Sequence, residues 1–219
     1  MTDLSVPDAR LHHSWAAAMA EYTAVGEEEP HGSGLWDLDR VDVTLAGCQE
    51  LVAHLLAQRD PATQPPEGRV HCTYLWITEA TEAAERAGAE PEFVGYLALR
   101  HTLTPWLLEE GGHIGYSVRP SRRREGHASR ALVLALDRAA ALGLDRVLLT
   151  VDEANVGSRG VIERAGGVYE DSRRGKRRYW IATGAPADQP ADQPADQPAD
   201  QPVTGAGSAP RSAGRGAPA

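Results

Sequence analysis

Arginine and small residues gather in one short stretch, where an expected strand meets an expected helix. Five arginines and one glutamate lie between positions 119 and 130, although the 219-residue chain has a net charge of −9. Gly126 and Ala128 have small side chains, so a ligand could approach the backbone closely there. The first N–H groups of a helix lack intrahelical partners and carry the positive end of its dipole. This combination favours an anion, and a diphosphate suits it well.

The flanking residues supply the elements that would position this turn. Bulky side chains alternate over residues 113–118, which indicates a strand, and Pro120 ends it because proline cannot donate a ladder hydrogen bond. Apolar residues recur at helical spacing from position 128 to 139, and Gly143 follows as a cap. On these residues alone, an anion site and an ordinary solvated turn both remain open.

The spacing of the small and basic residues matches a known pattern. The stretch Arg123-x-x-Gly126-x-Ala128 fits the pyrophosphate-loop signature Gln/Arg-x-x-Gly-x-Gly/Ala, with Val118-Arg119-Pro120 before it and Asn155-x-x-Ser158 after it. With this context the chain resembles the GNAT superfamily of acetyl-CoA-dependent N-acetyltransferases, over the residues from Tyr74 to Ile181. The run from Gly112 to Pro120, together with Gly166-Gly167 and Arg178-Tyr179-Trp180-Ile181, looks like a bacterial subgroup of predicted acetyltransferases whose substrate is unassigned.

The resemblance implies an α/β fold with a GNAT-like mixed, mostly antiparallel central sheet, flanking helices and a splayed parallel strand pair. That pair would be the strands at 113–118 and 146–151, and the domain would span residues 1–182. Sequence periodicity also predicts helices at 7–25, 42–58 and 158–165, and strands at 70–77, 93–100, 168–171 and 177–181. Residues 78–91 are expected to form an exposed insertion, and 101–112 a longer loop.

The resemblance also implies where the coenzyme would lie. The exposed edge of the central strand would pair with the pantetheine arm, which places the Tyr116 N–H near the acetyl oxygen and Val118 against pantetheine. Main-chain N–H groups around Arg124 would take the pyrophosphate. The implied cofactor-binding residues are Tyr116, Val118, Arg123, Arg124, Gly126, His127, Ala128, Asn155 and Ser158. For Asn155, a turn or helix cap is an alternative role.

The general base is less well defined. His113 is the first candidate, because it begins the central strand and imidazole titrates near neutrality. Glu110 and His101 are the alternatives. Each of the three could instead be structural, since deprotonation through water would need no single essential residue.

The acid for the departing thiolate is also open. Many members of the family have a tyrosine in the short helix that follows Asn155, but this chain has Ile162 there. Tyr169, Ser158 or water would then supply the proton, or the thiolate would leave unprotonated.

Composition weighs against several other classes of protein. The negative net charge argues against general nucleic-acid binding, which needs a broad basic surface. The sequence has no signal-peptide pattern and no apolar run of membrane-spanning length. Cys48 and Cys72 lack metal-ligand spacing and are expected to be buried free thiols. We therefore expect a cytoplasmic protein without a metal and without a membrane partner.

The composition changes after position 182. The sequence Ala-Asp-Gln-Pro occurs four times between Ala187 and Pro202, and a Gly/Ala/Pro-rich segment follows. Proline at every fourth position prevents a stable helix, and no apolar residues offset the entropy of ordering. The sequence therefore predicts a disordered tail over 183–219.

Together these observations predict an enzyme that moves the acetyl group of acetyl-CoA directly to a primary amine of a small molecule or protein. Neither cysteine lies in the motif region, so no covalent acyl-enzyme is expected. Glu27, Glu28 and Glu29 hint at a cationic small molecule, and dimers are common among relatives, so a homodimer is open. The missing tyrosine suggests one alternative, a non-catalytic acyl-CoA-binding or sensing module. An unrelated phosphate or nucleotide binder is another.

Overall fold

Four antiparallel strands form the larger of two sheets in the computed structural model, which describes residues 1–38, 41–80 and 86–184. In spatial order they are β1 (Thr2–Ser5), β2 (Cys72–Glu79), β3 (Glu92–Arg100) and β4 (Ile114–Val118). β2, β3 and β4 confirm the predicted strands with shifted ends, whereas β1 was not predicted. β4 lies at the edge of this sheet, so one side of its backbone pairs with β3 and the other side pairs with no strand of the described residues.

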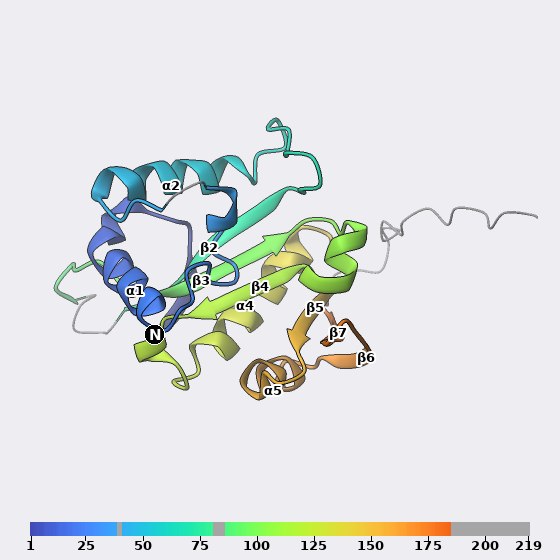
Figure 1. Ribbon diagram of the computed structural model, residues 1–219. Coiled ribbons are helices and arrows are strands. Elements are labelled where there is room, and N and C mark those ends of the chain that lie inside the picture. The colour runs from blue at the N-terminus through green and yellow to red at the C-terminus, as the bar shows by residue number, and fades with distance from the viewer. Residues whose placement is uncertain (39–40, 81–85, 185–219) are drawn as a thin grey trace, which may run out of the picture.

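Two helices, α1 (His12–Ala24) and α2 (Leu45–Ala57), cover one face of this sheet (Figure 1). Their apolar sides bury an aromatic-rich cluster against β2 and β3. Within it, the Trp15 indole N–H donates to the Tyr96 hydroxyl at 2.7 Å, which satisfies a polar group that burial would otherwise leave unpaired. Both predicted helices are confirmed, and each is shorter at its ends than predicted.

The helix α4 (His127–Ala141) covers the opposite face of the sheet. Ala131, Leu132, Ala135 and Ala139 recur at helical spacing and are fully buried. They pack in a second core cluster with residues of both sheets. This helix therefore fixes the position of its own first turn, which follows the arginine-rich segment.

A smaller antiparallel sheet holds the last three strands in the order β5 (Arg146–Asp152), β7 (Lys176–Ala182) and β6 (Val168–Arg173). A short helix, α5 (Val156–Arg164), connects β5 to β6 and begins two residues earlier than predicted. The strands predicted at 146–151, 168–171 and 177–181 are thus confirmed with shifted ends, and β5 lies at an edge of its sheet. In Figure 1 this sheet and α5 lie together at one end of the larger sheet.

The two strands predicted to be splayed, β4 and β5, belong to separate sheets. They are joined just before β4, where the main-chain N–H of His113 donates to the Leu148 carbonyl at 2.7 Å. Gly112 makes this close approach possible: it has φ +62°, and a Cβ atom there would lie 2.4 Å from the Leu148 carbonyl oxygen. Beyond the junction the strands separate, and the gap between them leads to the start of α4.

Several other expectations can be compared with the structure. The segment predicted as a loop at 101–112 contains a π-helical turn at Leu107–Gly111. Cys48 and Cys72 are buried and form no disulfide, which confirms the prediction of buried free thiols. Within the described residues, no helix has both the length and the apolar character needed to cross a membrane. Residues 81–85 of the predicted insertion, and the predicted tail from 185 onward, lie outside the described residues.

Candidate active site

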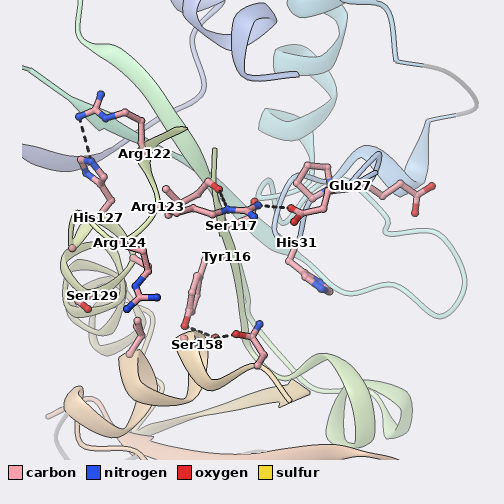
Figure 2. Close-up of a pocket in the computed structure, with 18 of the residues that line it drawn as sticks. Glu27, His31, Tyr116, Ser117, Arg122, Arg123, Arg124, His127, Ser129 and Ser158 are labelled. Atoms are coloured by element: carbon pink, nitrogen blue, oxygen red, sulfur yellow. Dashed lines mark hydrogen bonds and ion pairs between the residues drawn. The ribbon is translucent and has the colours of Figure 1, made fainter. Parts of the chain in front are cut away.

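A cavity of about 690 Å³ opens where β4 separates from β5, between the loop at 26–31, the first turn of α4 and α5 (Figure 2). Its wall includes every residue that the sequence implied for coenzyme binding. These are Tyr116, Val118, Arg123, Arg124, Gly126, His127, Ala128, Asn155 and Ser158. The fold therefore brings together residues that lie more than 40 positions apart, on one strand, one turn and two helix starts.

The first turn of α4 is open toward a ligand. Gly126 precedes the helix with φ +92°, and a Cβ atom there would meet nothing within 4 Å. Among the described residues no side chain caps the start of this helix, so the N–H groups of its first turn remain available. A 15-residue helix also directs the positive end of its dipole to this place. These are the features of an anion site.

Two arginines of the turn are already engaged by carboxylates. Arg119 is buried, and its guanidinium pairs with Glu21 and with Glu92, the latter at 3.0 Å. Arg122 pairs with Glu79 and, at 2.6 Å, with the same Glu92. Ion pairs of this kind hold the turn against β2, β3 and α1. Neither guanidinium is therefore free to neutralise a bound anion in full.

The next two arginines differ from these. The Arg123 guanidinium donates to the Val118 carbonyl at 3.0 Å and pairs with Glu27 at 2.6 Å, across the mouth of the cavity. Arg124 adopts φ +71° and forms no hydrogen bond or ion pair with the described residues. Figure 2 shows both side chains at the cavity. Arg124 is therefore available to a ligand, and Arg123 can become available if Glu27 releases it.

The Tyr116 hydroxyl and the Ser158 hydroxyl lie 2.7 Å apart and bridge the gap between β4 and α5 (Figure 2). Burial raises the pKa of Tyr116 to about 12, although the bond to Ser158 acts in the opposite direction. The Asn155 side chain accepts the Ser158 N–H at 3.0 Å, so Asn155 caps α5, which was its alternative role. Tyr116 is thus a protonated hydroxyl inside the cleft at neutral pH.

A second cavity of about 300 Å³ lies on the other side of this bridge. It shares four lining residues with the first cavity: His31, Tyr116, Asn155 and Ser158. Its remaining wall includes two tryptophans and four charged residues, namely Trp36, Trp106, Arg100, Glu110, Asp152 and Lys176. The two cavities therefore meet at the Tyr116–Ser158 hydroxyl pair.

The structure separates the candidate catalytic residues from one another. His113 lines neither cavity; it is 6% exposed, and its Nδ1 accepts the Leu148 N–H at 2.9 Å. Burial, followed by the nearby Arg100 and Arg146 charges, lowers the pKa of His113 to about 4. Nδ1 of His113 is therefore used as an acceptor at the junction of the two sheets. Because the residue lines neither cavity, its ring does not face a place where an amine could bind.

The other candidates divide between the cavity walls and the surface. Glu110 lines the second cavity and accepts a weak contact from Arg174 at 3.4 Å. Tyr169 is exposed, lies outside both cavities and contacts the Ser172 hydroxyl at 3.1 Å. His101 also lies outside both cavities and contacts the Thr73 hydroxyl at 2.8 Å. Only Glu110 is placed where it could meet an acceptor.

Sequence reasoning missed two groups at the meeting of the cavities. His31 lines both, and partial desolvation, followed by the charge of Lys176, lowers its pKa. The Tyr116 side chain is the second, since the resemblance had implied a role only for its N–H. The available signal was the position of His31 close to Glu27, Glu28 and Glu29, which had hinted at a cationic small molecule.

The fold defined by these elements is that of acetyltransferases of known structure. The ribosomal-protein-S5-alanine acetyltransferase from Vibrio fischeri is 14% identical with a TM-score of 0.56, and covers 84% of this chain and 93% of its own. RimJ from Mycobacterium smegmatis, in complex with a CoA disulfide, is 22% identical with a TM-score of 0.52. The alignment covers 83% of this chain and 87% of RimJ. The microcin C7 self-immunity acetyltransferase MccE, in complex with acetyl-CoA and AMP, is 12% identical with a TM-score of 0.54. The alignment covers 83% of this chain and 92% of MccE.

A family model described as the acetyltransferase (GNAT) domain matches residues 35–168, which is more than half of the chain. The chain therefore belongs to the GNAT acetyltransferase family. This confirms the family, the fold class and the prediction of an acetyl-CoA-dependent N-acetyltransferase at the level of the family. No curated protein sequence matches the chain.

Proposed function

We propose that this protein transfers the acetyl group of acetyl-CoA directly to a primary amine of a small molecule or protein. The observation that carries the proposal is the meeting of two cavities at Tyr116 and Ser158, beside the open first turn of α4. One cavity would hold the coenzyme and the other the acceptor. The thioester would then lie at the junction, where amine and carbonyl carbon can meet.

The larger cavity suits coenzyme A along its length. The N–H groups at the start of α4 and the side chains of Arg123 and Arg124 would bind the diphosphate. The unpaired edge of β4 presents main-chain donors and acceptors to the amides of the pantetheine arm. The MccE and RimJ structures, which contain acetyl-CoA and a CoA disulfide, support this occupant.

The acid and base can be reassigned from the geometry. The acceptor nitrogen attacks the thioester carbonyl, the C–S bond breaks, and the ammonium proton passes to a base. His31, whose lowered pKa keeps it neutral, and Glu110 line the acceptor side and would serve as that base, directly or through water. The Tyr116 hydroxyl, in contact with Ser158, would protonate the departing thiolate in place of the tyrosine that Ile162 replaces.

The proposal leaves His113 and Tyr169 without a direct chemical role. His113 would hold the two sheets together, and Tyr169 would remain at the surface of β6. The acceptor would be a small molecule or a protein amine, and a ribosomal-protein acetyltransferase that shares this fold is a precedent for the second.

Thiol release measured with acetyl-CoA and a broad panel of amines tests the function. Turnover with at least one amine is expected, together with inhibition by CoA and none by ATP. Tight CoA binding without turnover across the panel would favour the alternative of an acyl-CoA-binding or sensing module. Competition by ATP as strong as that by CoA would point instead to an unrelated nucleotide site.

A further inference from the structure

Arg100, the last residue of β3, projects into the wall of the second cavity and is held there by the main chain. Its NH1 group donates to the carbonyl oxygens of Gly111 and Gly112, each at 3.2 Å. Its own main-chain N–H donates to the His113 carbonyl at 2.8 Å. The guanidinium is therefore fixed in place, and little side-chain entropy would be lost when a ligand binds it.

The other edge of this guanidinium has no partner in the described part of the chain. Its Nε and NH2 groups form no hydrogen bond with the described residues, and no carboxylate among them pairs with Arg100. By contrast, Asp152 pairs with Lys176 at 2.7 Å, and Glu110 with Arg174 at 3.4 Å. Asp152 is thus engaged and Glu110 has only a weak contact, and neither pairs with Arg100, which presents a free two-donor edge that matches a carboxylate.

The position of this edge relates it to the reaction centre. A Cβ atom at Gly115 would lie 3.7 Å and 3.8 Å from the two terminal nitrogens of Arg100, so the absent side chain leaves space beside the guanidinium. Gly115 directly precedes Tyr116 on β4. A carboxylate on Arg100 would therefore lie close to the place where the acetyl group is transferred. Trp36 and Trp106, which are 41% and 52% exposed, supply apolar walls.

We propose that the acceptor is a small amino-acid-like molecule that carries a carboxylate beside its primary amine, and that Arg100 binds the carboxylate through Nε and NH2. This inference rests on the proposed function and names its substrate class. The volume of about 300 Å³ lies at the lower end for small-molecule sites and suits such a molecule. Within the cavity, the amine would point to the Tyr116–Ser158 pair and the carboxylate to Arg100.

Matched acceptors test the proposal by a ratio and not by activity alone. An amino acid, its carboxamide and its decarboxylated amine share one reacting nitrogen and differ only at the group that faces Arg100. For the preferred side chain, we expect kcat/KM for the amino acid to exceed that for the carboxamide by about 100-fold. The variant Arg100→Met should reduce this ratio to near one, whereas Arg59→Met, at an exposed arginine outside both cavities, should leave it unchanged.

Arg100→Met also loses the two hydrogen bonds to the Gly111 and Gly112 carbonyls and could misfold for that reason. A second variant tests the proposal without this loss. Gly115→Ala keeps Arg100 and its bonds, and its methyl group would meet neighbouring atoms only at ordinary contact distances of 3.6 Å and more. It fills the space beside the guanidinium, so the ratio should fall by about 10-fold or more while CoA affinity is retained.

Three results would overturn the proposal: equal use of the amino acid and its carboxamide, an unchanged ratio in Arg100→Met, or preferred turnover of a peptide N-terminus that has no nearby carboxylate. Calorimetry on the CoA-saturated protein separates this failure from that of the proposed function. If an amino acid binds in a way that depends on Arg100 but is not acetylated, the carboxylate subsite is supported and the proposed acetyl transfer is contradicted. If amines are acetylated without a preference for a carboxylate, the proposed acetyl transfer is supported and the carboxylate subsite is contradicted.

Discussion

His113 and Leu148 exchange two hydrogen bonds at the point where the two sheets meet. The main-chain N–H of His113 donates to the Leu148 carbonyl at 2.7 Å, and the main-chain N–H of Leu148 donates to Nδ1 of His113 at 2.9 Å. A ring nitrogen can accept only when it carries no proton. The histidine that sequence reasoning ranked first as a base is thus a structural acceptor that must stay neutral.

This arrangement predicts an acid-sensitive junction. The pKa of His113 is about 4 in the folded chain against an ordinary value of 6.5, so the unfolded chain binds more protons between these values. The contribution of His113 to the free energy of unfolding is fully present above pH 6.5. It is lost as the pH falls toward 4, by up to about 3 kcal/mol. Urea unfolding at pH 7, 6 and 5 measures this loss. His113→Gln, which does not titrate, should flatten the slope, and equal slopes in both proteins would contradict the prediction.

A negative charge added at Gly126 is expected to weaken coenzyme binding. Gly126→Asp places a carboxylate in open space at the start of α4, where a diphosphate would bind, so CoA affinity should fall by at least about 10-fold. Gly68→Asp is the matched control, because Gly68 has φ +76°, open surroundings and no place in either cavity. Calorimetric titration with CoA compares them. If Gly126→Asp binds CoA as the wild type does, the coenzyme site is misplaced.

The Tyr116 hydroxyl is expected to act in catalysis and not in coenzyme binding. Tyr116→Phe removes the proton donor proposed for the thiolate, so kcat should fall by about 100-fold with little change in the KM for acetyl-CoA. Tyr169→Phe removes a hydroxyl outside both cavities and should leave kcat unchanged. Steady-state thiol release measures both. A large loss in Tyr169→Phe would restore the role first considered for that residue.

Glu27 is expected to compete with the coenzyme for Arg123. Both side chains are about two-fifths exposed, at 41% and 40%, and their 2.6 Å ion pair spans the mouth of the larger cavity. Glu27→Gln should free Arg123 and tighten CoA binding by about 3-fold at low salt, with the gain fading as salt screens the charges. Glu29→Gln serves as control, since Glu29 lines the same cavity without an ion pair among the described residues. Weaker binding in Glu27→Gln would contradict this competition.

The sequence predicted the larger elements because their signals are local. Four alanine or leucine positions at helical spacing indicate α4, and an almost wholly apolar run indicates β5. β1 was missed because its four residues include one buried side chain, Leu4, which gives too little alternation to recognise. Its strand character depends on pairing with β2, more than 70 positions away.

The residues predicted for the coenzyme could be grouped from sequence more readily than those that line the second cavity. Its residues follow a fixed spacing around Gly126, and all of them line one cavity. The acceptor side combines residues from β3, the π-helical turn and the loop at His31, and their proximity depends on the tertiary fold. The burial of His113 is likewise set by neighbours from distant segments, so its spacing alone could not distinguish a base from a core residue.

The division of the fold into two sheets also affects the order in which the protein can fold during synthesis. Residues 2–118 contain all four strands of the larger sheet, so this sheet can form before β5 leaves the ribosome. The smaller sheet requires β7, which is the last strand of the domain. The larger cavity is lined by residues up to Arg164 on α5, and α5 connects two strands of this smaller sheet. We therefore expect a nascent polypeptide stalled before β7 emerges to bind the coenzyme poorly, because α5 then lacks the complete sheet that positions it.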